Sequence, residues 1–171
     1  MNEAMKNLLT RRSIRKYTDE QVPDELLDQV LEAGLYAPTG MNRQNVVMVA
    51  VRDKETRDLM ANLNAAVMGS KNDPFYGAPC VIVVLGNAED YPVVENGSLV
   101  LGNLMNAAHA VGLGSCWIHR AKQVFESAEG KELLKKWGLP EHLVGIGNCI
   151  LGFPAEDPEA RPRLDGRIVK V

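Results

Sequence analysis

Three arginines and a serine lie close together near the start of the sequence, in the segment from Arg11 through Arg12 and Ser13 to Arg15. Guanidinium groups match the geometry of phosphate oxygens, and a serine hydroxyl can donate a further hydrogen bond. A phosphate monoester carries about two negative charges near neutral pH, so two or three arginines would offset it. The segment is a candidate phosphate site. A solvated basic turn after a helix is the alternative.

A polar loop carrying proline and glycine comes before a run of apolar residues. The loop extends from Ala37 to Asn45 and reads APTGMNRQN. The side chains of Asn42 and Gln44 each offer a donor and an acceptor, so they can read alternating carbonyl and N–H groups at the edge of a ring system. Thr39 adds a hydroxyl to the same loop. A polar connection that binds no ligand is the alternative.

Glycines open a third segment, Gly112 to Ile118, with the sequence GLGSCWI. They permit close approach of the backbone to a ligand. Their G-x-G follows a predicted helix and precedes a predicted strand, which is the reverse of the dinucleotide-binding fingerprint. Cys116 and His119 have C-x-x-H spacing, but no second pair of ligands lies nearby, so we predict no metal site. We interpret Cys116 as a packed core residue, because no base stands at a defined spacing to make it a nucleophile.

Hydrophobic periodicity predicts the elements that must position these groups. The runs 46–51 and 80–85 are apolar on both faces, which is typical of strands covered on both sides by helices. A helix predicted over 95–111 is rich in glycine and alanine, which permits close helix approach, as in a dimer core. The other predicted elements are helices over 3–10, from 23 to a stop at 37–40, over 54–68 and over 123–137, and strands over 115–118 and 143–153. Interleaved helices and buried strands predict an α/β or α+β sandwich.

The last part of the chain differs in composition from the rest. The 171 residues fit a single domain, 1–171. Residues 154–171 carry three prolines and few apolar side chains before Ile168, so they cannot build a core of their own. The ending Arg167–Val171 alternates like an edge strand. We therefore predict a tail over 154–171 that wraps a partner subunit. Arg161 and Arg163 lie in this tail and would alone be interpreted as solvated charges.

Composition argues against several classes of partner. A formal net charge of −3 and a pI near 5.6 do not favour bulk attraction to nucleic acid or to an anionic membrane. No stretch approaches the roughly 18 apolar residues that a membrane span requires. The N-terminal residues are not typical of a secretory signal, and three widely spaced cysteines are typical of a reduced compartment. We therefore expect a cytoplasmic protein.

Taken in order, four segments resemble the FMN-dependent nitroreductase family. They are RRSIRKY near residue 11, APTGMNRQN, AAHAVGLGSCWI, and a late GFP followed by RPRLDG. The resemblance covers nearly the whole chain. It implies an α+β fold, a three-layer α/β/α sandwich, and an intertwined homodimer with two FMN molecules in clefts at the dimer interface.

The resemblance also implies where FMN is bound. The segment near residue 11 would contact the phosphate, the ribityl chain and the pyrimidine edge, and a late basic pair would return to the phosphate. A loop from the other subunit and a strand end behind the isoalloxazine ring would complete the site. The matching positions are Arg11, Arg12, Ser13 and Arg15; Pro38, Thr39, Gly40, Met41 and Asn42, with Gln44 less clearly assigned; Cys116, Trp117 and Ile118; and Arg161 and Arg163.

The reaction implied by the resemblance is NAD(P)H-dependent reduction of a nitroaromatic, quinone or similar small-molecule acceptor by a ping-pong mechanism. Hydride would arrive at flavin N5, so no side chain is assigned as catalytic. We expect Arg15 to place positive charge near the pyrimidine edge, where it would stabilise the anionic reduced flavin. Alternatives on the same fold are a dehalogenase, a flavin-cleaving enzyme, or a non-catalytic flavin-binding or storage dimer.

Three features depart from the usual pattern of the family. Asn45 and Val46 follow the loop's glutamine where proline and an aromatic residue are frequent, which predicts a less aromatic rim. Arg43 and the pair His119-Arg120 add charge where small residues are common, so substrate preference is expected to differ. The chain is also shorter than the larger nitroreductases, and we expect a more open flavin site.

Overall fold

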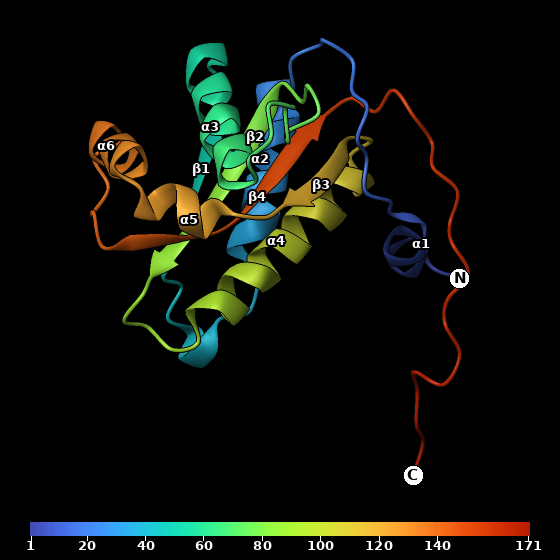
Figure 1. Ribbon diagram of the computed structural model, residues 1–171. Coiled ribbons are helices and arrows are strands. Elements are labelled where there is room, and N and C mark those ends of the chain that lie inside the picture. Colours follow the sequence, from blue (N-terminus) through green and yellow to red (C-terminus); the bar gives the residue numbers. More distant parts are fainter.

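A four-stranded antiparallel sheet forms the centre of the protein (Figure 1). The computed structural model describes residues 1–171. The strands, in the spatial order β1-β2-β4-β3, are β1 (Val46–Val51), β2 (Cys80–Asn87), β4 (Leu143–Gly152) and β3 (Gly114–Ile118). The two central strands are buried along nearly their whole length. Their continuous apolar sequences are therefore explained by burial of both faces.

Helices cover both faces of the sheet. Two separate hydrophobic clusters lie on the two sides, and β2 contributes alternate residues to them: Val81 and Val83 to one, Ile82 and Val84 to the other. The helices of the first side are α3 (Lys54–Val67), α5 (Ala121–Glu126) and α6 (Ala128–Lys136); those of the second are α2 (Asp24–Leu35) and α4 (Val93–Ala110). The predicted three-layer sandwich is confirmed.

The longest helix, α4, links two distant parts of the structure. In Figure 1 it runs from the loop that holds the short helix η1 (Gly40–Asn42) to α1 (Glu3–Thr10). Gly97 of α4 lies against β4: an added Cβ there would come within 2.2 Å of the Cδ1 atom of Ile146. At Gly102 an added Cβ would meet no atom within 4 Å. The small residues of α4 therefore serve packing on the sheet at one position and leave an open surface at another.

One local prediction was wrong. Residues 123–137 form two helices, because the chain turns at Ser127 in an extended conformation (φ −73°, ψ 162°). The Ser127 hydroxyl caps α6 by accepting a hydrogen bond from the Gly130 N–H at 3.1 Å. The segment Arg167–Val171 pairs with no strand of its own chain, and its pairing with a partner subunit stays a prediction. The segment Glu159–Val171 is exposed throughout and leaves the body of the protein (Figure 1).

Candidate functional site

The first arginines follow directly on α1, and α1 is held against the last turns of α4. The Asn7 side-chain amide donates to the Asn106 carbonyl at 2.9 Å, and the Thr10 hydroxyl is hydrogen-bonded to Nε2 of His109 at 2.8 Å. Burial and the positive charges of Arg11 and Arg12 lower the pKa of His109. These contacts determine where the chain leaves α1, and hence where both arginines lie.

The next residues run alongside β3. Ser13 forms a parallel bridge with Ser115, and the Ile14 N–H donates to the Ser115 carbonyl at 3.0 Å. Ile14 is buried against Gly114, where an added Cβ would lie within 2.9 Å of the isoleucine side chain. The glycine before Ser115 is thus required for close packing of the arginine segment on the sheet edge.

The C-terminal tail begins beside the same segment. The Thr18 N–H donates to the Phe153 carbonyl at 3.0 Å, and the Ala155 N–H donates to the Lys16 carbonyl at 2.9 Å. The carboxylate of Glu156 accepts a hydrogen bond from the Arg15 N–H at 2.5 Å. The tail is therefore tied to the arginine segment by backbone contacts before it leaves the body.

This arrangement brings arginines from both ends of the chain to one cavity of about 500 Å³. The residues that line it are Arg11, Arg12, Ser13, Arg15, Pro158, Glu159, Arg161 and Arg163. None of these five arginines has a carboxylate within 4.0 Å of its guanidinium nitrogens. The Nη1 atom of Arg11 is buried and has no hydrogen-bond partner. Gathered like charges and a buried unpaired donor both favour the binding of an anion, and a phosphate group fits this donor set.

A second cavity, of about 380 Å³, shares Arg15 with the first. Its walls include the end of β3, at Cys116, Trp117 and Ile118, and the turn that follows. Cys116 is 3% exposed, as expected for a packed core residue. Because Arg15 borders both cavities, a ligand with a phosphate at one end and a ring at the other could extend past it from the first cavity into the second.

The predicted loop of Pro38, Thr39, Gly40, Met41, Asn42 and Gln44 does not join these residues in one chain. It lines neither cavity. The Gly40 N–H donates to Oδ1 of Asn96, in the first turn of α4, at 2.9 Å. By the rise of 1.5 Å per residue, Asn96 lies about 20 Å along the helix axis from His109, which is hydrogen-bonded to Thr10 just before the arginine segment. The sequence prediction that one protomer supplies the arginines and another supplies the loop is compatible with this separation.

The loop nevertheless has features of a functional segment. Met41, Asn42 and Gln44 all have positive φ angles, of 54°, 52° and 52°. Non-glycine residues rarely adopt this conformation, and clusters of them are typical of binding sites. The Gln44 N–H donates to the Thr39 hydroxyl at 3.0 Å, which helps to hold the loop.

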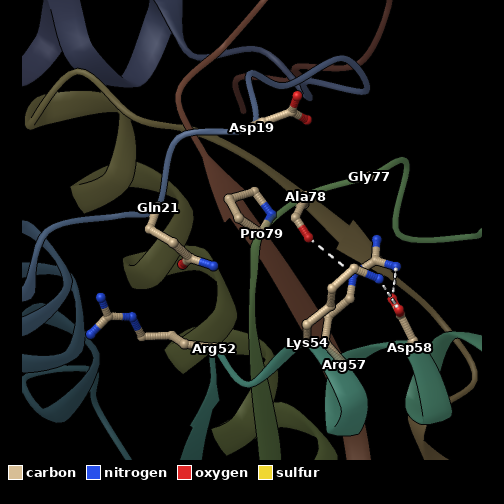
Figure 2. A pocket seen from close by; sticks show the side chains of 9 residues that line it. All are labelled: Asp19, Gln21, Arg52, Lys54, Arg57, Asp58, Gly77, Ala78 and Pro79. Atoms are coloured by element: carbon tan, nitrogen blue, oxygen red, sulfur yellow. Dashed lines mark hydrogen bonds and ion pairs between the residues drawn. The ribbon is translucent and has the colours of Figure 1, made fainter.

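A different cavity, of about 360 Å³, also carries several cations, but each is paired with a carboxylate of the chain; Figure 2 draws the pairing with Asp58. Arg52 pairs with Asp24, Lys54 pairs with Asp58, and Arg57 pairs with Asp58 and Asp73. Nε of Arg57 also donates to the Ala78 carbonyl at 3.0 Å. These paired cations therefore differ from the unpaired arginines of the first cavity, and we assign no ligand here.

Sequence reasoning missed one wall of the second cavity. That wall is the connection between α3 and β2, which contributes Met68, Ser70, Asn72, Asp73, Pro74 and Tyr76. The guanidinium of Arg15 lies over the Tyr76 ring, 6.0 Å from its centroid. The Asn-Asp-Pro sequence at 72–74 could have predicted the turn that forms this wall. Asp73 accepts hydrogen bonds from the N–H groups of Phe75 and Gly77, each at 2.8 Å, and so shapes this wall.

Comparison with known proteins agrees with this geometry. A profile of the nitroreductase family matches residues 8–72 and 66–153. The FMN reductase (NAD(P)H) of Bacillus subtilis is 30% identical over 181 residues, which cover 96% of this chain and 71% of that protein. A nitroreductase with bound FMN from Bacteroides fragilis superposes with a TM-score of 0.90 at 26% identity, over 100% of both chains. Another with bound FMN, from Desulfitobacterium hafniense, has a TM-score of 0.91 at 28% identity, over 100% of this chain and 99% of that one. The chain belongs to the nitroreductase family.

None of the helices combines the length and apolar character needed to span a membrane. No cluster of three or more His, Cys, Asp or Glu side chains has a geometry that could hold a metal ion.

We predict that the three thiols do not react in the folded protein. Cys80, Cys116 and Cys149 are unpaired and at most 3% exposed, and burial raises the pKa of Cys80 to about 12. Ellman's reagent at pH 8 should therefore label no thiol in native protein and all three in denaturant, because the thiolate is the reactive form. Rapid labelling of Cys116 in native protein would contradict its assignment as a packing residue.

Proposed function

We propose that this protein is an FMN-dependent oxidoreductase that uses NAD(P)H to reduce nitroaromatics, quinones or similar small acceptors by a ping-pong mechanism. The observation that carries the proposal is the meeting of five unpaired arginines, from both ends of the chain, at a cavity that adjoins a second cavity at the end of β3. The family and its FMN-bound members support FMN as the ligand.

In this proposal the first cavity binds the FMN phosphate. Arg11 would use its buried, unpartnered Nη1 atom, and Ser13 its hydroxyl. Arg161 and Arg163 would close the cavity from the tail, while Arg12 is oriented by hydrogen bonds from Nη1 to the carbonyls of Leu9 and Arg11 at 3.0 and 2.7 Å. Four guanidinium groups would offset the phosphate charge and leave a surplus of positive potential for other anionic groups.

The second cavity binds the isoalloxazine ring. The chemistry supplied by bound FMN is hydride acceptance from NAD(P)H, followed by electron transfer to the acceptor. Cys116, Trp117 and Ile118 would form the wall behind the ring. Arg15, at the junction of the two cavities, would direct positive charge toward the ring and so favour its reduced, anionic form. NAD(P)H and the acceptor would use the open side of this cavity in turn.

We further propose a homodimer in which the loop of the partner subunit completes each site. No residue of α1 is buried, although Met5, Leu8 and Leu9 give it an apolar face, between 46% and 55% exposed. On α4, Leu99 is 47% exposed, and Gly102 lies at an open surface. Exposed apolar helix surfaces of this kind mark protein interfaces. Packing of these surfaces against a second copy would bring the strained 38–44 loop to the arginines of the other subunit, and residues 154–171 would cross onto the partner.

The reaction is tested with purified holoprotein under anaerobic conditions. We expect tightly bound FMN, oxidation of NAD(P)H on addition of a nitroaromatic or a quinone, and parallel lines in double-reciprocal plots, as ping-pong kinetics require. A protein that binds FMN but does not turn over NAD(P)H would support a flavin-binding or storage role instead. A colourless protein that FMN cannot reconstitute would defeat the proposal.

The phosphate site predicts selective loss of FMN binding. The double variant Arg11→Ala/Arg161→Ala should weaken FMN binding by about 100-fold, because each charge-assisted hydrogen bond contributes roughly 1.5–3 kcal/mol. Its affinity for riboflavin, which has no phosphate, should change little. Flavin fluorescence titration measures both affinities. Arg167→Ala, a tail arginine outside the cavity, is the matched control, and equal losses for both flavins would contradict the assignment.

The dimer predicts that two exposed leucines respond differently to charge. Leu99→Glu on α4 should shift the protein toward monomer and weaken FMN binding, because a carboxylate is costly in an apolar interface. Leu59→Glu is the control: Leu59 is 42% exposed but lies on α3, in the opposite layer. Sedimentation velocity and FMN titration give the two readouts. If the unmodified protein is a monomer that still binds FMN tightly, the shared site is wrong.

A further inference from the structure

Arg120 occupies an unusual position at the edge of the second cavity. The chain leaves β3 at Ile118 and enters α5 at Ala121, so that Arg120 is the residue before the helix. Its backbone is left-handed, with φ 75° and ψ 7°. Glycine or asparagine would adopt this conformation with less strain. A strained arginine at the border of a cavity therefore suggests that its side chain serves a purpose there.

A buried amide holds this residue at two points. Asn64, on α3, is fully buried. Its Nδ2 atom donates to the carbonyl of His119 at 2.8 Å, and its Oδ1 atom accepts a hydrogen bond from Nε of Arg120 at 3.2 Å. One side chain therefore anchors both the backbone before the arginine and the inner part of the guanidinium. Asn64 is a positioning residue for Arg120.

The outer part of the guanidinium has no partner in the chain. Arg120 makes no salt bridge, and its hydrogen bond to Asn64 uses only Nε, which leaves both terminal nitrogens free. The one acidic residue lining the cavity, Asp73, is already paired with Arg57 and with two backbone N–H groups. Arg15, the other arginine that lines this cavity, borders the phosphate cavity as well. Arg120 is thus the cation of this cavity that neither the chain nor the cofactor phosphate neutralises.

We propose that Arg120 binds an anionic group of the substrate and so makes the enzyme prefer anionic over neutral substrates. The inference rests on the proposed function, because the substrate is taken to bind beside the flavin in the second cavity. The shared chemistry is an oxyanion that accepts hydrogen bonds from the two free terminal nitrogens. Its source is either a carboxylate on the acceptor or a phosphate of the nicotinamide dinucleotide.

The test compares two acceptors that differ in charge and little in shape, 4-nitrobenzoate and 4-nitrobenzamide, with FMN-loaded enzyme. Arg120→Gln should lower the ratio of their kcat/KM values by about tenfold, the effect of losing one charge-assisted interaction at a partly exposed site. Arg120→Lys, which keeps the charge, should retain most of the preference. Lys122→Gln removes a nearby exposed charge on α5 and should leave the ratio unchanged.

The electron donor, NAD(P)H, provides the second part of the experiment. One outcome is that Arg120→Gln raises the KM for NAD(P)H while the ratio of the kcat/KM values for the two acceptors stays unchanged. If Arg120→Lys then restores the KM, the anion is the dinucleotide phosphate. A lower acceptor ratio assigns it to the acceptor carboxylate. The proposal is wrong if neither quantity changes, or if both acceptors and the FMN content decline together, which is the result of a merely structural role.

Wild-type enzyme provides an independent measurement in case the glutamine variant does not fold. The preference for 4-nitrobenzoate over 4-nitrobenzamide should fall as ionic strength rises from about 0.01 to about 1 M, over which the Debye length shrinks from roughly 30 to 3 Å. The proposal is overturned if neither this preference nor the KM for NAD(P)H depends on salt. If wild-type protein binds FMN and reduces 4-nitrobenzamide, the proposed function stands whatever the result for Arg120. If it does neither, both fail.

Discussion

The pairing of two distant chain segments beside the edge of β3 is the constraint on which the site depends. Ser13 pairs with Ser115, and Tyr17 pairs with Pro154, so the N-terminal segment lies between a sheet strand and the start of the tail. Burial reinforces the pairing: the Tyr17 hydroxyl donates to the Ile14 carbonyl at 2.7 Å, and desolvation strongly raises the pKa of Tyr17. Without these contacts the arginines at the two ends of the chain would have no common cavity.

The first cavity differs from other charged surfaces of the protein in whether its cations are paired with carboxylates. The cations of Figure 2 each have a carboxylate partner, so their charge is used to hold the fold together. The arginines of the first cavity have none, and their mutual repulsion is a cost that a bound anion removes. Arg120 is likewise a cation without a carboxylate partner, and the buried amide of Asn64 positions it. Unpaired, well-positioned cations thus distinguish a binding surface from a structural ion-pair network.

Much of the architecture could be predicted from local patterns. β1 has the predicted bounds, because six consecutive apolar residues between polar segments leave little choice of strand limits. The break between α5 and α6 was missed, since the helical pattern continues through it. It depends on the fit of Gly130 against the Val124 carbonyl, which an added Cβ would approach to 2.0 Å. The small residues of α4 were interpreted as a dimer surface, whereas Gly97 is required by the side chain of Ile146 on β4.

The amino-acid sequence was sufficient to identify the residue types that can bind a phosphate, the order of the elements, and the family resemblance that relates its four motifs. These properties are local, or depend only on order along the chain. The tertiary structure decided which arginines share a cavity, which ones find carboxylates elsewhere, and that the 38–44 loop lies at the other end of α4 from the arginines of its own chain. It also revealed that Asn64 holds Arg120. Those outcomes depend on distances between groups far apart in sequence, and such distances exist only once the sheet has paired and the helices have packed on it.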